Sequence, residues 1–272
     1  MDLSLSMVQA LFGVSSSTTA STGSAAMAIP ALQRATADGA EAKGIEREKK
    51  DPVSISALAQ FRTALDKADT IEKALQDPRI LKVLLPALGL AGQEGNGALV
   101  RRALLSDPKD TKGLAAQLGT TWQAAAETLG VHSTGLAGLR DSTLVENLTN
   151  GFLKYQYRTG LDDTQAGMSD ALYFLESAKT ATDVYGVLGN TVLRRVVTGA
   201  LELPDAMAIQ AVETQGRAVT SRLRIDSLQD DKAVRKLAER YLIAAANAAA
   251  EGSSSSTDAL SMITTLSVSL RA

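Results

Sequence analysis

One apolar stretch with the pattern of two short helices occurs twice in this chain, and this repeat limits the possible folds more than any other feature. The first copy is residues 70–90, TIEKALQDPRILKVLLPALGL, and the second is residues 183–203, DVYGVLGNTVLRRVVTGALEL. Asp77 and Asn190 stand at the start of the second helix in each copy, and both residue types are strong helix caps. Aligned without a gap, the copies share five apolar residues, at Leu75/Leu188, Val83/Val196, Ala87/Ala200, Leu88/Leu201 and Leu90/Leu203.

Two related helical halves follow from this repeat, because one copy alone has too little area to bury its own apolar face. The alignment predicts that Val83 and Val196 occupy equivalent buried positions. A fainter similarity joins residues 107–115, DPKDTKGLA, to residues 230–238, DDKAVRKLA. Strand patterns are nearly absent. We therefore predict an all-α fold, a multi-helix bundle of two related helical halves with a disordered N-terminal arm.

The 272 residues divide by composition into three parts. Residues 1–51 have a short apolar start, a Ser/Thr/Ala-rich stretch and then a charge cluster, so we expect a mobile arm. Residues 52–251 carry the helical spacing and the repeat at 70–90 and 183–203, so we expect one all-helical domain. In residues 252–272, Gly252 and the four serines 253–256 predict a hinge before a short amphipathic segment.

Charge and residue usage exclude several classes of protein. The formal net charge is −2, with Lys and Arg scattered among Asp and Glu, which argues against a nucleic-acid binder with its basic face. No apolar run approaches the roughly 18 residues needed to span a bilayer. The chain has no Cys, so disulfides, thiolate metal sites and Cys nucleophiles are excluded. We expect no nucleic-acid partner and no membrane span.

The residues that often carry chemistry form no recognisable motif here. The one histidine, His132, lies in a predicted turn without a partner at catalytic spacing. The glycine-rich residues 91–97 follow a helix and lack the Gly-Lys-Ser or Gly-Lys-Thr of a phosphate loop. Asp162, Asp163 and Asp170 lack the spacing of a calcium loop and are interpreted as helix-capping acids. We therefore predict no catalytic, cofactor-binding or metal-binding residue and no cofactor, we identify no small-molecule substrate, and we expect no enzyme.

Seven short motifs are spread between residues 68 and 230. They are ADTIE (68–72), DPRIL (77–81), ALGL (87–90), LLSDP (104–108), LVEN (144–147), ALYF (171–174) and LQD (228–230). With these motifs the chain resembles the bacterial domain-of-unknown-function 1217 family over about residues 58–243. Members of this family are mostly alphaproteobacterial and often belong to flagellar gene neighbourhoods, so the resemblance implies a link to the flagellum. It implies no set of catalytic residues.

The function favoured by these observations is a non-enzymatic structural or assembly protein of the flagellum. The absence of Cys, the Ser/Thr-rich arm without a secretory signal and the apolar ends fit export by the flagellar route. The expected partners are proteins, either flagellar components or a second copy of this chain. The alternative is a helical binding module, such as a chaperone or regulator, that acts in the cytoplasm or periplasm.

Two apolar stripes at the ends of the chain are the candidate partner-binding residues. A helix of about twelve residues is marginal alone in water, so each stripe needs a surface to bury against. The protein's own core is one such surface, and a partner is the other. We hypothesise that the stripes are assembly elements. Their residues are Leu5, Val8, Leu11 and Phe12 at the N-terminal end and Leu260, Ile263, Leu266 and Leu270 at the C-terminal end.

Overall fold

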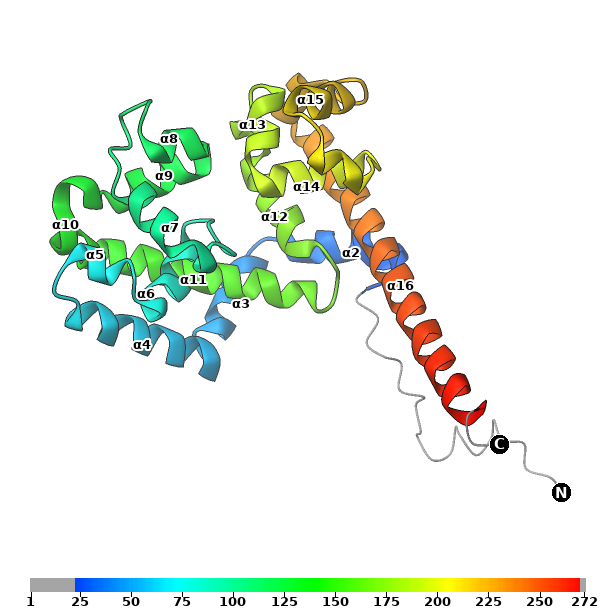
Figure 1. Cartoon of the computed structure of the whole chain (residues 1–272), viewed down its shortest axis with the longest axis horizontal. Coiled ribbons are helices and arrows are strands. Elements are labelled where there is room, and N and C mark those ends of the chain that lie inside the picture. Colours follow the sequence, from blue (N-terminus) through cyan, green and yellow to red (C-terminus); the bar gives the residue numbers. More distant parts are fainter. Residues whose placement is uncertain (1–22, 270–272) are drawn as a thin grey trace.

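The computed structural model describes residues 23–269, including the side chains of residues 23–251, and every regular element in that range is a helix. The all-α prediction is thereby confirmed. The helices form two lobes, each with its own hydrophobic core (Figure 1). In Figure 1 the first lobe, in cyan and green, lies on the left, and the second lobe lies on the right with the long helix α16 beside it.

The repeated stretch forms the same pair of helices in both lobes. The first copy contains α5 (Ile71–Ala74) and α6 (Pro78–Ala87), and the second contains α13 (Val184–Gly189) and α14 (Thr191–Ala200). The Asp77 carboxylate accepts a hydrogen bond from the backbone N–H of Arg79 at 2.9 Å. The Asn190 side-chain oxygen accepts from the backbone N–H groups of Val192 and Leu193, both at 3.0 Å. The two caps predicted from the sequence are confirmed.

Equivalent positions of the two copies are buried alike. Val83 in α6 and Val196 in α14 are both 0 % exposed, as the alignment predicts. The two helices also end alike, because the N–H of Leu90 donates to the carbonyl of Leu85 at 2.8 Å and the N–H of Leu203 donates to the carbonyl of Thr198 at 2.9 Å. Such bonds occupy carbonyl groups that the end of a helix leaves open.

The equivalence extends further towards the N-terminus than the sequence comparison indicates. Helix α4 (Pro52–Lys67) precedes the first copy, and α12 (Met168–Ser177) precedes the second. Continuing the ungapped alignment pairs Phe61 with Phe174, and both rings are 0 % exposed. Helix α4 packs on α6 as α12 packs on α14. Each lobe is therefore built on three helices in the same order.

A fourth helix completes each set. Helix α11 (Ser142–Asp162) packs on α6, and α16 (Asp231–Ser269) packs on α14. Asp141 and Asp230 cap these helices by accepting backbone N–H groups of their first turns. We call α4, α5, α6 and α11 the first unit, and α12, α13, α14 and α16 the second unit.

The residue before each of these caps holds the end of the unit's first helix. Arg140 donates to the carbonyl groups of Leu65, Asp66 and Ala68 at the end of α4. Gln229 donates to the carbonyl groups of Lys179 and Ala181 beyond the end of α12. Residues 230–238 therefore correspond to residues 141–149. The fainter similarity to residues 107–115 does not mark an equivalent segment, because Asp107 lies in a turn.

The units differ in the segment that joins their third and fourth helices. In the second unit this segment contains the short 3₁₀ helices η3 and η4 on either side of α15, and in the first unit it contains four α-helices. Those of the first unit add Trp122 and Leu139 to the core of the first lobe. The bounds are η1 Glu94–Asn96, α7 Gly97–Leu104, α8 Leu114–Leu118, α9 Thr120–Leu129 and α10 Val131–Leu139 in the first unit, and η3 Asp205–Ile209, α15 Val212–Thr220 and η4 Ile225–Gln229 in the second, with η2 Ala178–Thr180 following α12.

Asn190 joins the two lobes as well as capping α14. Its side-chain nitrogen donates to the hydroxyl of Thr121 in α9 at 3.2 Å and to the hydroxyl of Tyr173 in α12 at 3.0 Å. The residue is 8 % exposed, so these bonds are made largely out of water. A single side chain thus connects the first lobe to two helices of the second.

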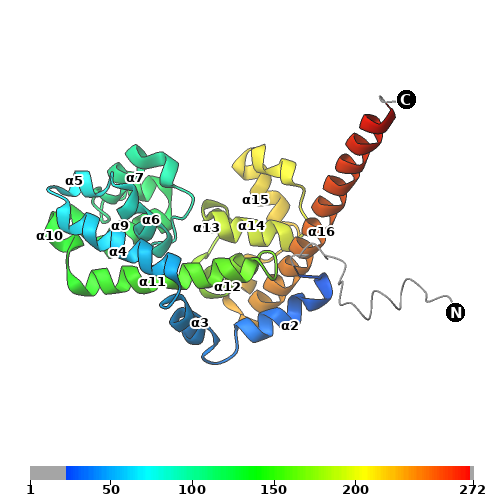
Figure 2. The same ribbon diagram turned by 90° about the horizontal axis from the view of Figure 1, so that it is seen from below.

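Two helices precede the first unit where we expected a mobile arm. Helix α2 (Ala25–Ala35) packs on α16, and α3 (Ala40–Glu48) packs on α11 (Figure 2). The structure differs from the expectation because Ala28 and Leu32, both 0 % exposed, bury one face of α2 in the core of the second lobe. We call residues 25–48 the strap, because they lie across both lobes. Residues 1–22 lie outside the described residues.

The C-terminal part also differs from the expected hinge. Helix α16 runs without a break through Gly252 and the serines 253–256 to Ser269, since serine carries only a modest helix penalty. Figure 1 shows this end of α16 projecting away from the lobes. Within the described residues, no helix is both long and apolar enough to cross a membrane.

Candidate functional site

A groove of about 830 Å³ lies between the strap and the turn that joins α11 to α12. We call it the strap groove. Its apolar lining comes from Met27, Ala31 and Ala35 on α2 and from Leu161 and Met168 on the other side. Met27 is 46 % exposed, so part of this apolar side chain is open to solvent. Since the larger exposed apolar surfaces of proteins often serve binding, the groove is the leading candidate site in the described chain.

The strap supplies a positively charged rim to this groove. Arg34, Lys43 and Arg47 line it and are exposed, and the lining includes no Asp or Glu. Arg34 donates to the Pro30 carbonyl on its own helix at 3.3 Å. Among the described residues none of these three cations forms an ion pair, so their charges are available to a ligand.

Gln165 belongs to the lining of the groove, and its side-chain amide has no hydrogen-bond partner among the described residues. It is 2 % exposed, and neither its Nε2 nor its Oε1 is hydrogen-bonded to any of the described residues. A buried polar group without a partner costs about 1–3 kcal/mol of stability. The large majority of buried side-chain amides are satisfied, so Gln165 is an exception, and its two amide atoms are closed off from the groove.

The backbone around Gln165 explains why the amide is buried. Its N–H donates to the Leu161 carbonyl at 2.9 Å and its own carbonyl accepts the N–H of Met168 at 3.2 Å, which closes the turn between α11 and α12. Gly23, which also lines the groove, lies directly against this amide, because an added Cβ there would overlap Oε1 of Gln165. Only glycine allows the chain to pass so close to this amide.

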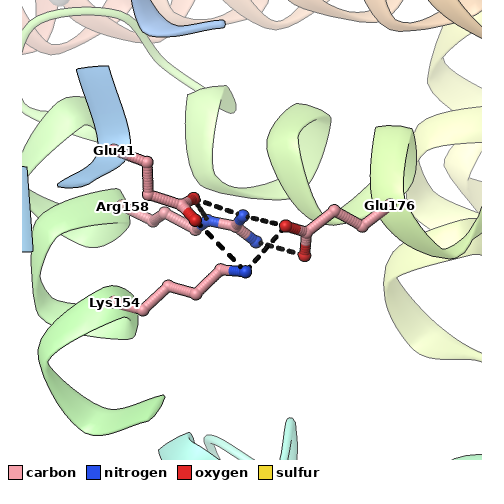
Figure 3. A network of polar contacts seen from close by, with 4 residues as sticks. All are labelled: Glu41, Lys154, Arg158 and Glu176. Atoms are coloured by element: carbon pink, nitrogen blue, oxygen red, sulfur yellow. Dashed lines mark hydrogen bonds and ion pairs between the residues drawn. The ribbon is translucent and has the colours of Figure 1, made fainter. Parts of the chain in front are cut away.

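A network of four charged side chains holds α3 beside α11 and α12 (Figure 3). The guanidinium of Arg158 donates to Glu41 on α3, with Nε at 2.9 Å, and to Glu176 on α12, with Nη2 at 2.6 Å. Lys154 lies 3.3 Å from the Glu41 carboxylate and 2.7 Å from that of Glu176. The network thus ties the strap to both units and fixes the wall of the groove that carries Lys43 and Arg47.

Burial and charge act in opposite directions on this network. Burial disfavours the ionised form of Glu176, but hydrogen bonds from Arg158 and Lys154 outweigh it and hold the pKa of Glu176 below its usual range. Burial would likewise lower the pKa of Arg158, yet the bonds to Glu176 and Glu41 raise it. Arg158 is 8 % exposed, so it remains charged because two carboxylates satisfy its donors.

Close packing also fixes α3 on α11. Gly44 is buried on the face of α3 that meets Tyr157, and a Cβ at this position would overlap ring atoms of Tyr157. Any larger residue would therefore push α3 away from α11. The groove is held rigidly by this contact and by the four-charge network.

A second cluster of polar side chains lies where α12, α14 and α16 meet, and these side chains are hydrogen-bonded or ion-paired to one another. Asp170 accepts a hydrogen bond from the Tyr241 hydroxyl at 2.8 Å and pairs with Arg195 at 2.7 Å. Burial, and then the charge of Asp170, raises the pKa of Tyr241, so the phenol stays a donor. Asp162 accepts the N–H of Ser169 at 2.8 Å, which confirms its predicted capping role. Asp170 forms an ion pair in place of the cap predicted for it.

The remaining candidates from the sequence lie elsewhere. His132 is in α10, where its Nδ1 lies 3.0 Å from the Leu105 carbonyl oxygen. No cluster of His, Cys, Asp or Glu in the described part of the chain has the makings of a metal site. Leu5, Val8, Leu11, Phe12 and Leu270 lie outside the described residues, and Leu260, Ile263 and Leu266 belong to α16 beyond the described side chains.

Two comparisons place this architecture among known proteins. A family model described as "Protein of unknown function (DUF1217)" matches residues 87–234, more than half of the chain. The chain belongs to the DUF1217 family. The crystal structure of protein AGR_C_984 from Agrobacterium tumefaciens is similar, with a TM-score of 0.65 over 82 % of this chain and 94 % of that one, at 21 % identity. At that identity the likeness shows the fold alone. A search of curated proteins found no match.

Few features of the sequence indicate the groove in this family member. The second half of the strap is polar and charged, and its first half is rich in alanine, with the apolar patch at residues 29–32 as its main hydrophobic feature. Gln165 is a single polar residue in a predicted loop. The spacing of Ala28 and Leu32, one helical turn apart, is the one feature that indicates a buried face.

Proposed function

We propose that this protein is a non-enzymatic, protein-binding component of an assembly, linked to the bacterial flagellum. The strap groove is the observation that carries the binding part of this proposal. It combines apolar walls with three exposed cations that have no ion-pair partners among the described residues. Binding sites commonly combine an apolar concave surface with a few convergent polar groups.

The link to the flagellum rests on the family resemblance and its gene neighbourhoods, which is an argument by association. The terminal stripes, including Leu11 and Leu266, extend the proposal to contacts during assembly. Export by the flagellar route is part of the same proposal. A chaperone or regulator that acts inside the cell would use the same groove and is the alternative.

The test is the location of a tagged, functional copy. We expect it to purify with flagellar structures, and to appear in the culture medium of export-competent cells and not in that of export-defective cells. A copy that stays in the cytoplasm while it still binds a flagellar component would favour the chaperone or regulator. A copy that never meets flagellar components would remove the flagellar link.

Charge substitutions test the terminal stripes separately. Leu11→Asp and Leu266→Asp are expected to prevent incorporation, because an unpaired charge is not buried at an apolar contact, and to leave the melting temperature nearly unchanged. Ser17→Asp and Ser255→Asp add the same charge at polar positions of the same segments and serve as matched controls. A melting temperature lowered by several degrees with normal incorporation would assign the stripes to the protein's own core.

A further inference from the structure

We propose that the strap groove of one copy of this chain receives an exposed apolar loop of a second copy, so that copies join head to tail. The loop is residues 205–213, which contain η3 and the start of α15. We call it the knob. The inference rests on the proposed assembly function and names the partner as a second copy of this chain.

The knob holds apolar side chains out in solvent. Ile209 is 90 % exposed, the highest fraction among the large apolar side chains of residues 23–251, and Val212 is 49 % exposed. Three alanines of the same loop, Ala206, Ala208 and Ala211, are exposed as well. Isoleucine is among the residues that proteins bury most often, so a run of exposed apolar residues around one marks a contact surface.

Buried groups hold the knob in this shape. Met207, in the middle of the loop, is 6 % exposed and anchors it on the second lobe. Gln215, which is 4 % exposed, donates from Nε2 to the carbonyl of Gln210 at 2.8 Å and to that of Ala208 at 3.3 Å. A loop that is already held by such bonds loses little conformational entropy when it binds.

The charges at the two ends of the knob are opposite to those of the groove. Asp205 and Glu213 are exposed and form no ion pair within the described chain. Arg194 and Arg195 line a small hollow beside Asp205, but Arg195 is paired with Asp170. The rim of the strap groove carries three exposed cations, and no carboxylate lines it. Opposite charges on two surfaces raise their rate of association and fix how they meet.

The strap groove has the size and the walls for the tip of the knob. Its volume of about 830 Å³ is much larger than one aliphatic side chain, so it has room for Ile209 and its neighbours. Met27 and Met168 line it, and methionine adapts to the shape of a partner because its side chain is unbranched and flexible. Apolar area on both surfaces would leave water in this contact.

The knob and the groove of one copy lie too far apart to meet. Figure 2 shows α15, which begins in the knob, and α2, which carries one wall of the groove, with α14 between them. Figure 1 shows the same order from another side. The contact therefore joins two copies.

A contact between two different surfaces can be repeated. When the knob of one copy enters the groove of the next, one knob and one groove remain free at the ends of the pair. Such a head-to-tail contact builds a ring or an open filament, depending on the rotation between neighbours. This is the form of self-association that a repeating assembly uses.

The first experiment measures self-association of the full chain by sedimentation velocity over a series of protein concentrations. We expect the size to grow with concentration and to fall with added salt. Ile209→Asp and Met27→Asp are each expected to weaken association about thirtyfold or more, the effect of losing a central interface residue, while the melting temperature stays nearly unchanged. Ile55→Asp changes an isoleucine that is 51 % exposed on α4 and is the matched control, with association retained.

Mixing the two variants tests whether the knob meets the groove. The Ile209→Asp copy keeps its groove, and the Met27→Asp copy keeps its knob. The mixture is therefore expected to form dimers with one copy of each, which grow no further, whereas each variant alone stays monomeric.

A crosslink detects the same contact where it is weak. The chain has no Cys, so a cysteine introduced at one position reports on that position alone. Copies with Ile209→Cys, mixed with copies that carry Met27→Cys and oxidised, are expected to form a disulfide-linked dimer. Copies with Ile55→Cys in place of Ile209→Cys are expected to form none with the Met27→Cys copies.

The proposal is overturned if the mixed variants form neither dimer nor crosslink, or if Ile209→Asp associates as tightly as the parent protein. Loss of association in Leu11→Asp but not in Ile209→Asp would assign the groove to the N-terminal stripe and would equally overturn it.

Other outcomes separate this inference from the proposed function. A parent protein that stays monomeric and forms no crosslink, with a tagged copy that still purifies with flagella, removes the second copy as partner and leaves the proposed function in place. Self-association through the knob in a protein that never meets flagellar components supports this inference and removes the flagellar link.

Discussion

The first and second units have the same arrangement of four helices. Different side chains bind the helix ends and connect the helices in the two units. Arg140 donates to three carbonyl groups at the end of α4, whereas Gln229 donates to two at the equivalent place in the second unit. The buried positions match more closely, as Phe61 and Phe174 show. The difference teaches that the shape of the core is the repeated feature, and that any donor of suitable reach completes the helix ends.

The helix caps show how a small change adds a new contact. Asp77 caps α6 and pairs with its neighbour Arg79. Asn190 caps α14 in the same way, but its amide also donates to Thr121 and Tyr173. A carboxylate has no proton to donate at neutral pH, so the amide at the second position is what connects the lobes.

The largest expected effect tests the equivalence of the cores. Phe61→Ala and Phe174→Ala each remove a fully buried ring, and each is expected to lower the free energy of unfolding by about 3–5 kcal/mol. Urea denaturation of both variants gives the measurement, and Phe→Leu at each position provides milder versions if the alanine variants do not fold. A small loss at one position with a large loss at the other would show that the two units do not share one core design.

A second prediction concerns the charge network, whose central arginine has no counterpart in the second unit. Arg158 in α11 corresponds to Asn247 in α16, which is exposed. Arg158→Met is expected to lower the free energy of unfolding by about 1–3 kcal/mol at neutral pH, because Glu41 and Glu176 lose their shared donor. Arg62→Met, at an exposed position of α4, is the matched control and is expected to have little effect.

The pH dependence of this difference has a definite sign. The pKa of Glu176 is lower in the folded protein than its usual value of 4.5. The stability that it contributes is therefore present above about pH 4.5 and is lost as the pH falls through the folded pKa. The difference between the parent protein and Arg158→Met is expected to shrink as urea titrations are moved into this acid range. A constant difference would mean that Glu176 does not depend on Arg158.

The helix caps and the repeat could be predicted from the sequence because each cap, and each copy of the repeat, is a short continuous stretch of residues. Asp77, Asn190 and the buried valines were found in this way. The pairing of Phe61 with Phe174 was not, because the residues around the two rings differ in type. The equivalence became visible only in the structure, where α4 packs on α6 and α12 packs on the equivalent helix α14.

The strap and its groove could not be predicted for a different physical reason. The buried residues of the strap are small or few, such as Ala28 and Gly44, so a hydrophobicity pattern hardly registers them. Their partners, Tyr157 and helix α16, are more than a hundred positions away in the sequence. The amide of Gln165 became unusual only once the fold had buried it.

The caps supply a third, smaller test of the comparison. Asp77→Ser and Asn190→Ser both keep a capping oxygen, since Ser caps about as well as Asp or Asn. Asn190→Ser also loses the donors to Thr121 and Tyr173, so it is expected to cost about 1–2 kcal/mol, the value of two neutral hydrogen bonds. Asp77→Ser loses an exposed ion pair and is expected to cost about 0.5 kcal/mol or less. Equal losses in chemical denaturation would show that Asn190 is only a cap.

Another small expected effect, this one in the stabilising direction, lies at the residue that ends the repeated helix. Gly89 has φ +73° after α6, and its equivalent after α14 is Glu202 with φ +52°. Both positions support the same hydrogen bond back to the helix, but a residue with a Cβ is strained in this left-handed region. Glu202→Gly relieves that strain and gains freedom in the unfolded chain, so the net stabilisation is expected to be about 0.5–1 kcal/mol.

The reverse change at the equivalent position completes this comparison. A Cβ at Gly89 would meet Thr121 and Tyr173 at 3.8 and 3.9 Å, ordinary contact distances, so Gly89→Ala tests the backbone conformation without a clash. It is expected to lower the free energy of unfolding by about 1 kcal/mol, opposite in sign to Glu202→Gly. Chemical denaturation of both variants, and of the double variant, gives the two values and their sum. If Glu202→Gly destabilises the protein, the glutamate side chain contributes more than the strain removes, and the two helix ends are alike in geometry only.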